Sequence, residues 1–175
     1  EDADGFTVGS VCGVDGIRTL AGSVILRADT GNIIVSNTGA TADVAATTGI
    51  NVVLAADNAL LTINNGANLT NATSGGVTLS ADKMALNGTI TATSQTVTLK
   101  NSVGADAINL GSTTDAAMDT LELSDAELDG ITASKLVIGT ATMGPITVSS
   151  DINLTNNVTT LRLNTGRTGT ATAGG

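Results

Sequence analysis

Large aromatic side chains are almost missing from this sequence of 175 residues, which has one Phe, Phe6, and neither Trp nor Tyr. A globular core in a chain of this length ordinarily uses several large aromatic side chains. Val, Ile, Leu and Ala must therefore fill the interior. These small side chains fill space well only where the core is thin and regular, as it is between the sheets of a repetitive β-structure.

Histidine is absent, and Cys12 is the only cysteine. This composition excludes an intrachain disulfide, and it excludes zinc and redox motifs that need several Cys or His side chains. We interpret Cys12 as a small apolar side chain in the core. A chain nearly free of cysteine is typical of long bacterial surface proteins, which stay unfolded until they are exported.

Positive charge is also scarce, because 7 Lys and Arg stand against 16 Asp and Glu, for a net charge of -9. Such a chain has no basic surface for nucleic acid or for an anionic membrane. No run approaches the roughly 20 apolar residues of a membrane span. The acidic start, Glu1-Asp2-Ala3-Asp4, is unlike a signal peptide, so we expect a mature chain or a piece of a longer one.

What the sequence does contain is a short phrase in which two apolar residues flank one outward-facing residue, often Thr, Asn, Glu or Arg. This alternation predicts short β-strands with one buried face. The phrases are Val24–Leu26, Ile33–Val35, Val52–Leu54, Leu61–Ile63, Val77–Leu79, Met84–Leu86, Ile90–Ala92, Val97–Leu99, Ile108–Leu110, Leu121–Leu123, Leu136–Ile138, Ile146–Val148, Ile152–Leu154 and Leu161–Leu163.

Comparable phrases return at intervals of roughly 20 to 25 residues, which is the signature of a solenoid. We therefore predict an all-β fold, a parallel β-solenoid (β-helix) with about seven repeats. Residues 1–175 would form one domain, with 1–20 atypical or capping and 77–163 carrying the clearest repeats. Asn65-Gly66 and Asn87-Gly88 leave hairpins open. Neither end resembles a polar cap, so we expect further repeats or another chain beyond at least one end.

One segment breaks the strand pattern, Ser124–Gly130. Ser124 and Glu127 have the spacing of a capping box, in which each side chain bonds the other residue's backbone N–H. Asp125 favours a helix N-terminus, and Gly130 can end the helix. The segment predicts one helical turn near 124–130, interpreted as a structural corner between repeats.

The order of phrases from Val77 to Leu163 resembles the repeats of filamentous-haemagglutinin-like large exoproteins of Gram-negative bacteria. The phrases that carry it are Ile108-Asn109-Leu110-Gly111, Leu121 to Ala133, Leu136-Val137-Ile138-Gly139 and Gly144-Pro145-Ile146-Thr147-Val148. The resemblance implies a right-handed parallel β-helix, secretion through an outer-membrane partner, and a role as an adhesin, a biofilm component or a toxin stalk. Right-handedness also agrees with the general rule for parallel crossovers.

Candidate catalytic residues are few. Asp29-Thr30-Gly31 matches the aspartic protease triplet, but that chemistry needs two copies and the chain has one. Asp125, Glu127 and Asp129 are the best carboxylate cluster for a carbohydrate enzyme, with Lys135 the only base nearby. Sugar-binding aromatic platforms are missing. We therefore predict that the chain is not an enzyme.

No cofactor or metal site is predicted, although calcium bound by Asp, Asn and carbonyl oxygens stays open. The EF-hand pattern and the calcium-binding Gly-Gly-x-Gly-x-Asp repeat are both absent. Five Asn-x-Thr sequons are candidate glycosylation acceptors, in a number that chance alone would give. They are Asn68, Asn71, Asn87, Asn153 and Asn157.

Thr-x-Thr pairs such as Thr91/Thr93 and Thr140/Thr142 do not recur at the repeat period, so we read them as outward strand residues rather than an ice-binding face. The function expected is a non-catalytic structural or adhesive stalk of a secreted or cell-surface exoprotein. Its partners would be neighbouring repeats or copies of the same protein, and host or cell-surface glycans or proteins. The alternatives are a self-assembling filament or sheath subunit, a glycan- or ice-binding module, and a β-helix carbohydrate enzyme.

Overall fold

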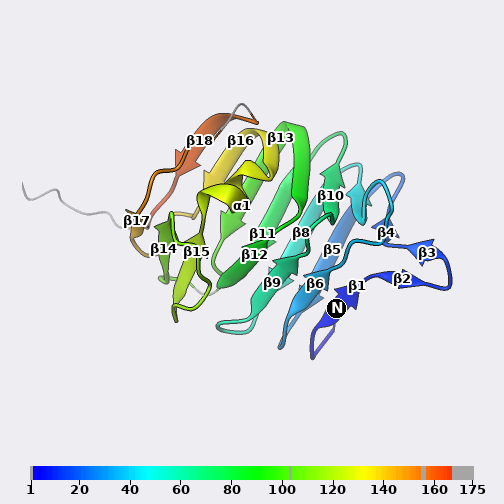
Figure 1. The fold of residues 1–175 in the computed structure, drawn as a ribbon, viewed down its shortest axis with the longest axis horizontal. Helices are drawn as coiled ribbons and strands as arrows, with labels where there is room; N and C mark the ends of the chain where they lie inside the picture. The colour runs from blue at the N-terminus through cyan, green and yellow to red at the C-terminus, as the bar shows by residue number, and fades with distance from the viewer. Residues whose placement is uncertain (1, 103, 155–156, 167–175) are drawn as a thin grey trace, which may run out of the picture.

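The computed structural model describes residues 2–102, 104–154 and 157–166. These residues form an all-β fold whose strands pair almost entirely in parallel (Figure 1). In the described ranges, the only antiparallel pair is the hairpin of β2 (Ser10–Val11) and β3 (Val14–Asp15). None of the helices described is long and apolar enough to cross a membrane.

The first sheet contains four strands that come from well-separated parts of the sequence. Consecutive strands of this sheet pair in parallel, so the sheet gains one strand each time the chain comes back to it. The strands are β1 (Phe6–Val8), β6 (Ile33–Val35), β9 (Leu60–Ile63) and β12 (Lys83–Leu86).

The long sheet has two columns of parallel strands, which β13 (Thr89–Lys100) joins because it spans both. β16 (Ile131–Ile138) pairs with β13 along both columns, and β18 (Val158–Leu163) pairs with β16. One column begins with β4 (Ile17–Arg18), β7 (Val44–Ala46) and β10 (Asn68–Asn71). The other begins with β5 (Ser23–Ala28), β8 (Gly49–Leu54) and β11 (Val77–Ser80).

The third sheet breaks the sequence order, because its strands lie in the order β15, β14, β17. Their bounds are Thr120–Leu123 for β15, Ala107–Leu110 for β14 and Ile146–Val148 for β17. β15 also contacts β12 of the first sheet. The chain therefore passes from β13 to β14 and then turns back to place β15 between β12 and β14 (Figure 1).

The stacking is in register, so residues of one type lie above one another. Along the second column the paired inward positions are Val24, Ile50, Val77, Val97, Leu136 and Leu161. The first five of these are at most 6% exposed, and they belong to one continuous aliphatic core. An interior of stacked aliphatic rows leaves no space for large aromatic side chains, which accounts for the composition.

The intervals between paired residues are less uniform than the predicted 20 to 25. Val77 lies 27 residues after Ile50 and 20 before Val97, whereas Leu136 lies 39 after Val97. The long interval holds β14, β15 and the helix. Loops at the corners can vary in length without disturbing the ladder, because only the strands have to stay in register.

Thirteen of the fourteen predicted strand phrases lie in strands. Ile152–Leu154 does not, because the backbone N–H of Asn153 donates to Asp125 Oδ1 at 2.6 Å instead of to a neighbouring strand. The inward side chains predicted for the last phrases are only partly covered. Val148 is 57% exposed, Leu161 41% and Leu163 42%, since β17 and β18 each pair on one side only among the strands that the structure describes.

The predicted helical turn is α1 (Asp125–Asp129), and its capping box is confirmed. Ser124 N–H donates to Glu127 Oε2 at 2.8 Å, and Glu127 N–H donates to Ser124 Oγ at 3.3 Å. Gly130 follows the helix with a right-handed φ of -69°, so left-handed freedom is not its role. A Cβ there would lie 2.7 Å from the Gly88 carbonyl oxygen, which explains why a glycine is needed.

The prediction for Cys12 was wrong, because this residue is exposed. It lies with Gly13 in the turn between β2 and β3, at φ values of 52° and 79°. Positive φ at both central residues is the geometry of a tight two-residue hairpin. Neither Asn65-Gly66 nor Asn87-Gly88 forms a hairpin, since they connect β9 to β10 and β12 to β13, which lie in different sheets.

Candidate functional site

A cavity of about 820 Å³ lies where α1 meets the β12–β13 connection and the loop after β14. Its walls carry carboxyl groups from separate segments of the chain. Asp125 and Glu127 come from α1, Asp115 from the β14–β15 loop and Asp151 from the segment after β17. This cavity is the best candidate site for chemistry or binding in the described part of the chain.

The Glu127 carboxylate is held by three donors. Oε1 accepts from the Leu86 backbone N–H at 3.0 Å, and Oε2 accepts from Ser124 N–H at 2.8 Å and Ser124 Oγ at 2.7 Å. The sequence predicts the Ser124 half of this arrangement through the capping box. The bond to Leu86 ties the helix to β12, so Glu127 mainly fixes local structure.

A second carboxylate, Glu122 of β15, organises the β14–β15 loop and is only 6% exposed. It accepts hydrogen bonds from Ser112 Oγ at 2.6 Å, Thr114 Oγ1 at 3.2 Å and Ala117 N–H at 2.8 Å. Burial alone would raise the pKa of Glu122, but these hydrogen bonds outweigh burial and lower that pKa. The outward position of Glu122 in its strand phrase gave no sign of this role.

Asp115 differs from both glutamates, because no described residue forms a hydrogen bond or ion pair with its carboxyl group. Burial, and then the neighbouring Glu127 and Glu122 carboxylates, raise the pKa of Asp115 to about 6, against the opposing effect of Lys83. An acid with this pKa exchanges its proton near neutral pH. Sequence reasoning missed Asp115, which belongs to no motif.

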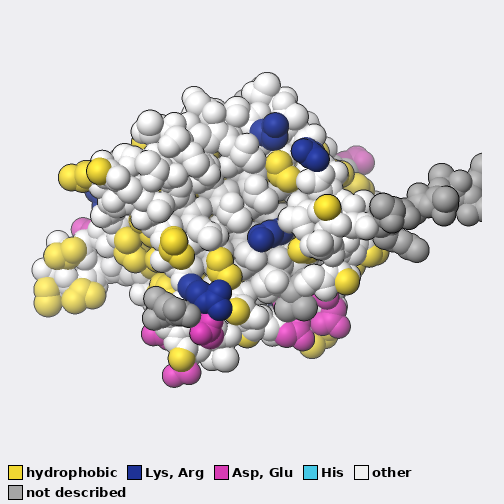
Figure 2. Space-filling view, turned by 180° about the vertical axis from the view of Figure 1, so that it is seen from behind, with side chains coloured by type: hydrophobic (Ala, Val, Ile, Leu, Met, Phe, Trp, Pro, Cys, Tyr) yellow, Lys and Arg dark blue, Asp and Glu magenta, His cyan; other side chains and the backbone are white. Residues whose placement is uncertain are grey.

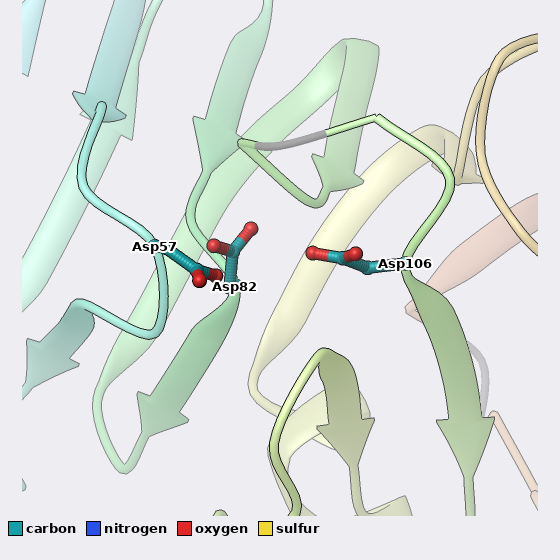
Figure 3. Close-up of side chains that lie close together, drawn as sticks. All are labelled: Asp57, Asp82 and Asp106. Atoms are coloured by element: carbon teal, nitrogen blue, oxygen red, sulfur yellow. The ribbon is translucent and has the colours of Figure 1, made fainter.

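A separate acidic cluster lies at the corner where the long sheet connects to the first and third sheets. Figure 3 shows the carboxyl groups of Asp57, Asp82 and Asp106 turned towards one another, and one oxygen from each lies within 4.8 Å of the others. Asp82 is fully buried and accepts from Ser102 N–H and Ser102 Oγ, both at 2.9 Å. These oxygens are the best match in the described residues to the calcium alternative, and the sequence singled out none of them.

Asp106 is the least satisfied member of this cluster, because its Oδ2 atom is buried without a hydrogen-bond partner among the described residues. Burial raises the pKa of Asp106, and the charges of Asp82, Asp119 and Asp57 raise it further. The three aspartates come from three successive connections, β8–β9, β11–β12 and β13–β14. Stacked connections explain how residues so distant in the sequence meet.

The catalytic candidates taken from the sequence do not come together in one site. Asp29 forms an ion pair with Arg27 at 2.6 Å on the surface, as expected of a turn residue. Asp125 and Glu127 line the cavity, whereas Asp129 and the exposed Lys135 do not. Asp125 Oδ1 accepts from the Asn153 backbone N–H. The cavity thus brings Glu127 together with Asp115 instead of with Asp129.

The five sequon asparagines have different environments. Asn71 is 2% exposed, and its side-chain amide donates to the carbonyls of Ser74 at 2.8 Å and Gly76 at 2.6 Å, so it is inaccessible to a modifying enzyme. Asn68 is half-buried in β10 and donates to the Gly66 carbonyl. Asn87, Asn153 and Asn157 are exposed.

Threonines do align across strands, and one of them, Thr91, belongs to a Thr-x-Thr pair that we did not expect to recur from strand to strand. Thr70, Thr91 and Thr132 are paired neighbours on β10, β13 and β16. The sequence spacing hid this row, because its intervals are 21 and 41 residues. All three side chains are half-buried.

Comparison of the chain with protein-family models, with curated proteins and with solved structures found no match.

Proposed function

We propose that this chain is a segment of a right-handed parallel β-helix of about seven coils, serving as a non-catalytic structural stalk in a secreted or cell-surface exoprotein. The observation that carries the proposal is the in-register row from Val24 to Leu161. Its six members occupy equivalent positions in six stacked levels, close to the number that the spacing predicts.

Such a row supports a mechanical role because every level contacts only its neighbours, so the structure extends in one direction. The backbone hydrogen bonds of the parallel strand pairs run from one level to the next, along that same direction. Right-handed coiling is supported by the strong preference of parallel crossovers for that hand. The resemblance of Val77–Leu163 to large bacterial exoproteins supports the stalk role and the extracellular location.

The surface agrees with a passive role. Figure 2 shows one face on which uncharged polar side chains and backbone predominate, interrupted by several groups of hydrophobic side chains, with the few Lys and Arg set apart and Asp and Glu mostly along the lower edge. A net charge of -9 discourages side-by-side aggregation of such rods. The aromatic anchors that dominate many binding interfaces are missing.

A self-assembling filament is a structural variant of the same proposal. It is favoured by the uncovered end of the stack, where β18 presents Leu161 and Leu163 at 41% and 42% exposure. β18 pairs with β16 on one side only among the described strands. An open strand edge with apolar side chains is a template for further β-structure, from the same or another copy.

The carbohydrate-enzyme alternative is favoured by one observation, the proximity of Asp115 to Glu127 in a cavity. Glycoside hydrolysis uses two carboxyl groups, one as a proton donor. Glu127 is a poor partner for this chemistry because its oxygens already accept three hydrogen bonds. The row of Thr70, Thr91 and Thr132 similarly favours an ice- or glycan-binding face, but it is only one residue wide.

Electron microscopy of the native assembly tests the stalk proposal. Unbranched rods or fibres with an axial repeat of about 4.8 Å are expected. Compact particles without that repeat would overturn the stalk, and the enzyme and binding alternatives would then be assayed with the purified chain on polysaccharides and on ice.

A further inference from the structure

The acidic cluster of Asp57, Asp82 and Asp106 is built around one carboxylate that other segments hold in a fixed orientation. Asp82 is fully buried, and its Oδ1 accepts from Ser102 N–H and Ser102 Oγ, both at 2.9 Å. Its Oδ2 accepts from the Asn58 backbone N–H at 3.1 Å. The β8–β9 and β13–β14 connections therefore supply the donors that position the carboxylate of the β11–β12 connection.

Two buried oxygen atoms of the β13–β14 connection have no hydrogen-bond partner among the described residues. One is Asp106 Oδ2, which belongs to the carboxyl group that Figure 3 shows turned towards Asp82. The other is Oδ1 of Asn101, a residue that is only 1% exposed. The Asn101 side-chain amide donates to the Ala107 carbonyl at 3.2 Å, so Asn101 lies against the residue that follows Asp106. Carboxylate and amide oxygens can only accept, and buried acceptors of this kind require a donor, a water or an ion.

The charges around Asp106 favour an ion over a water. The groups whose charges act on Asp106 are Asp82, Asp119 and Asp57, and no Lys or Arg is among them. Carboxylates this close oppose one another's ionisation, and a divalent cation bound between them removes that repulsion. A water would satisfy Asp106 Oδ2 and leave the repulsion in place. The charges thus call for a cation, whereas the unpartnered oxygen alone would be satisfied by a water.

The spacing of the carboxylates fits calcium. One oxygen from each of the three aspartates lies within 4.8 Å of the others. Calcium binds oxygen at about 2.3 to 2.6 Å, so two of its ligands can be up to about 5 Å apart. Magnesium binds at about 2.0 to 2.1 Å, spans only about 4.2 Å and demands near-ideal octahedral geometry. Ligands from three loops, with Asp57 exposed to water, suit the larger ion, which tolerates an irregular shell.

We propose that Asp57, Asp82 and Asp106 bind one calcium ion, which joins the β8–β9, β11–β12 and β13–β14 connections. Asn58 and Ser102 orient Asp82 for the ion, and water completes the shell on the exposed side of Asp57. The ion then links three levels of the stack at one corner, beside the start of the out-of-order third sheet. The site does not depend on the stalk proposal, because it needs only the local packing of these connections.

Calorimetric titration of the intact chain with calcium chloride, after a chelator has removed bound metal, tests the proposal. We expect saturation at one calcium ion per chain, with a dissociation constant below about 1 mM. With free calcium at about 100 times that constant, the folded-to-unfolded ratio should be about 100-fold higher than in chelator. No saturation up to about 10 mM calcium, or equally tight binding of magnesium, would overturn the proposal.

Asp106→Asn locates the site, because it keeps the shape of the side chain and removes its charge. This variant should bind calcium at least about ten-fold more weakly. In chelator it should be as stable as the unaltered chain or more so, since the repulsion from Asp82 and Asp57 is relieved. A lost calcium response in a stable fold distinguishes a lost ligand from a damaged structure. Asp57→Asn, at an exposed position, should weaken binding as well.

Asp151→Asn is the matched control, because it removes the same charge from an exposed position in the separate acidic cavity beside α1. It should bind calcium as tightly as the unaltered chain. Binding that survives Asp106→Asn, or that is lost in Asp151→Asn, would place the ion elsewhere and overturn the proposal. If Asp106→Asn does not fold, Asp57→Asn decides, and an unchanged calcium affinity in that variant would contradict the site.

Discussion

The Glu127 carboxylate accepts a hydrogen bond from the backbone N–H of Leu86, a residue 41 positions earlier in the chain, at 3.0 Å. This bond occurs at the end of β12, where the other described strands of the first sheet find a backbone partner on the next strand. A helix side chain thus takes the place of a strand carbonyl. It fastens the out-of-order third sheet to the regular part of the stack.

We expect Glu127→Ala to lower the free energy of unfolding by about 2 to 4 kcal/mol, because it removes an N-terminal cap and leaves the Leu86 N–H without an acceptor. Chemical denaturation followed by circular dichroism measures this change. Thr113→Ala, an exposed position beside the same cavity, is the control and should change stability by less than about 0.5 kcal/mol. Equal effects of the two variants would show that the bond to Leu86 is unimportant.

The aliphatic rows should carry most of the stability. Leu99 is fully buried between Leu79 and Ile138, so Leu99→Ala should cost about 2 to 5 kcal/mol through lost burial and the cavity it leaves. Thr98→Ala changes the adjacent outward position of the same strand and should cost less than about 1 kcal/mol. Denaturant midpoints of the two variants provide the comparison, and a similar loss from both would argue against one inward-facing core.

Gly130 should be intolerant of substitution because another backbone segment approaches it closely. A left-handed conformation is not the reason. Gly130→Ala places a Cβ 2.7 Å from the Gly88 carbonyl oxygen, so either α1 or the β12–β13 connection must shift. We expect a loss of about 1 to 3 kcal/mol in thermal or chemical unfolding. Gly9→Ala is the matched control, because a Cβ there meets nothing within 4 Å. A neutral Gly130→Ala would mean that these two segments are farther apart.

Asp115 should make global stability depend on pH in the direction opposite to an ordinary ion-paired carboxylate. Because its pKa rises from 3.8 to about 6 on folding, its ionisation weakens the folded state progressively between those pH values. Asp115→Asn should therefore stabilise the protein at pH 7.5 by about 1 kcal/mol, after allowance for solvent screening, and have almost no effect at pH 3.5. Unfolding curves at both pH values test this, and destabilisation at pH 7.5 would refute it.

The regular part of the fold is predictable from sequence because alternation of apolar and polar residues marks each strand separately. The sequence analysis did not predict β7 and β10, and the reason is physical. Ala45 and Ala46 have little apolar surface, and in β10 only Leu69 is a large buried apolar residue. Both strands are defined by pairing with their neighbours, which no local pattern reports.

The order of the third sheet is also invisible in the sequence. β14 and β15 have the same strand phrase as the others, and nothing local says that β15 lies between β12 and β14. The capping box of Ser124 and Glu127 was predictable because its two residues are three positions apart. Asp115 meets Glu127, and Asp57 meets Asp106, only through that tertiary arrangement.

A ladder of engineered disulfides tests the central claim, the in-register parallel stack, most directly. Asn51, Thr78 and Thr98 are successive paired positions on β8, β11 and β13, outside the core. In a Cys12→Ser background, the cysteine pairs 51/78 and 78/98 should each form a disulfide, since neighbouring strands place Cα atoms about 4.8 Å apart. The pair 51/98 skips one strand and spans about 10 Å, so it should stay reduced. Mass spectrometry under mild oxidation gives the answer: cross-linking of both neighbouring pairs and not of 51/98 is the predicted result, and cross-linking of 51/98 without the other two would contradict the stack.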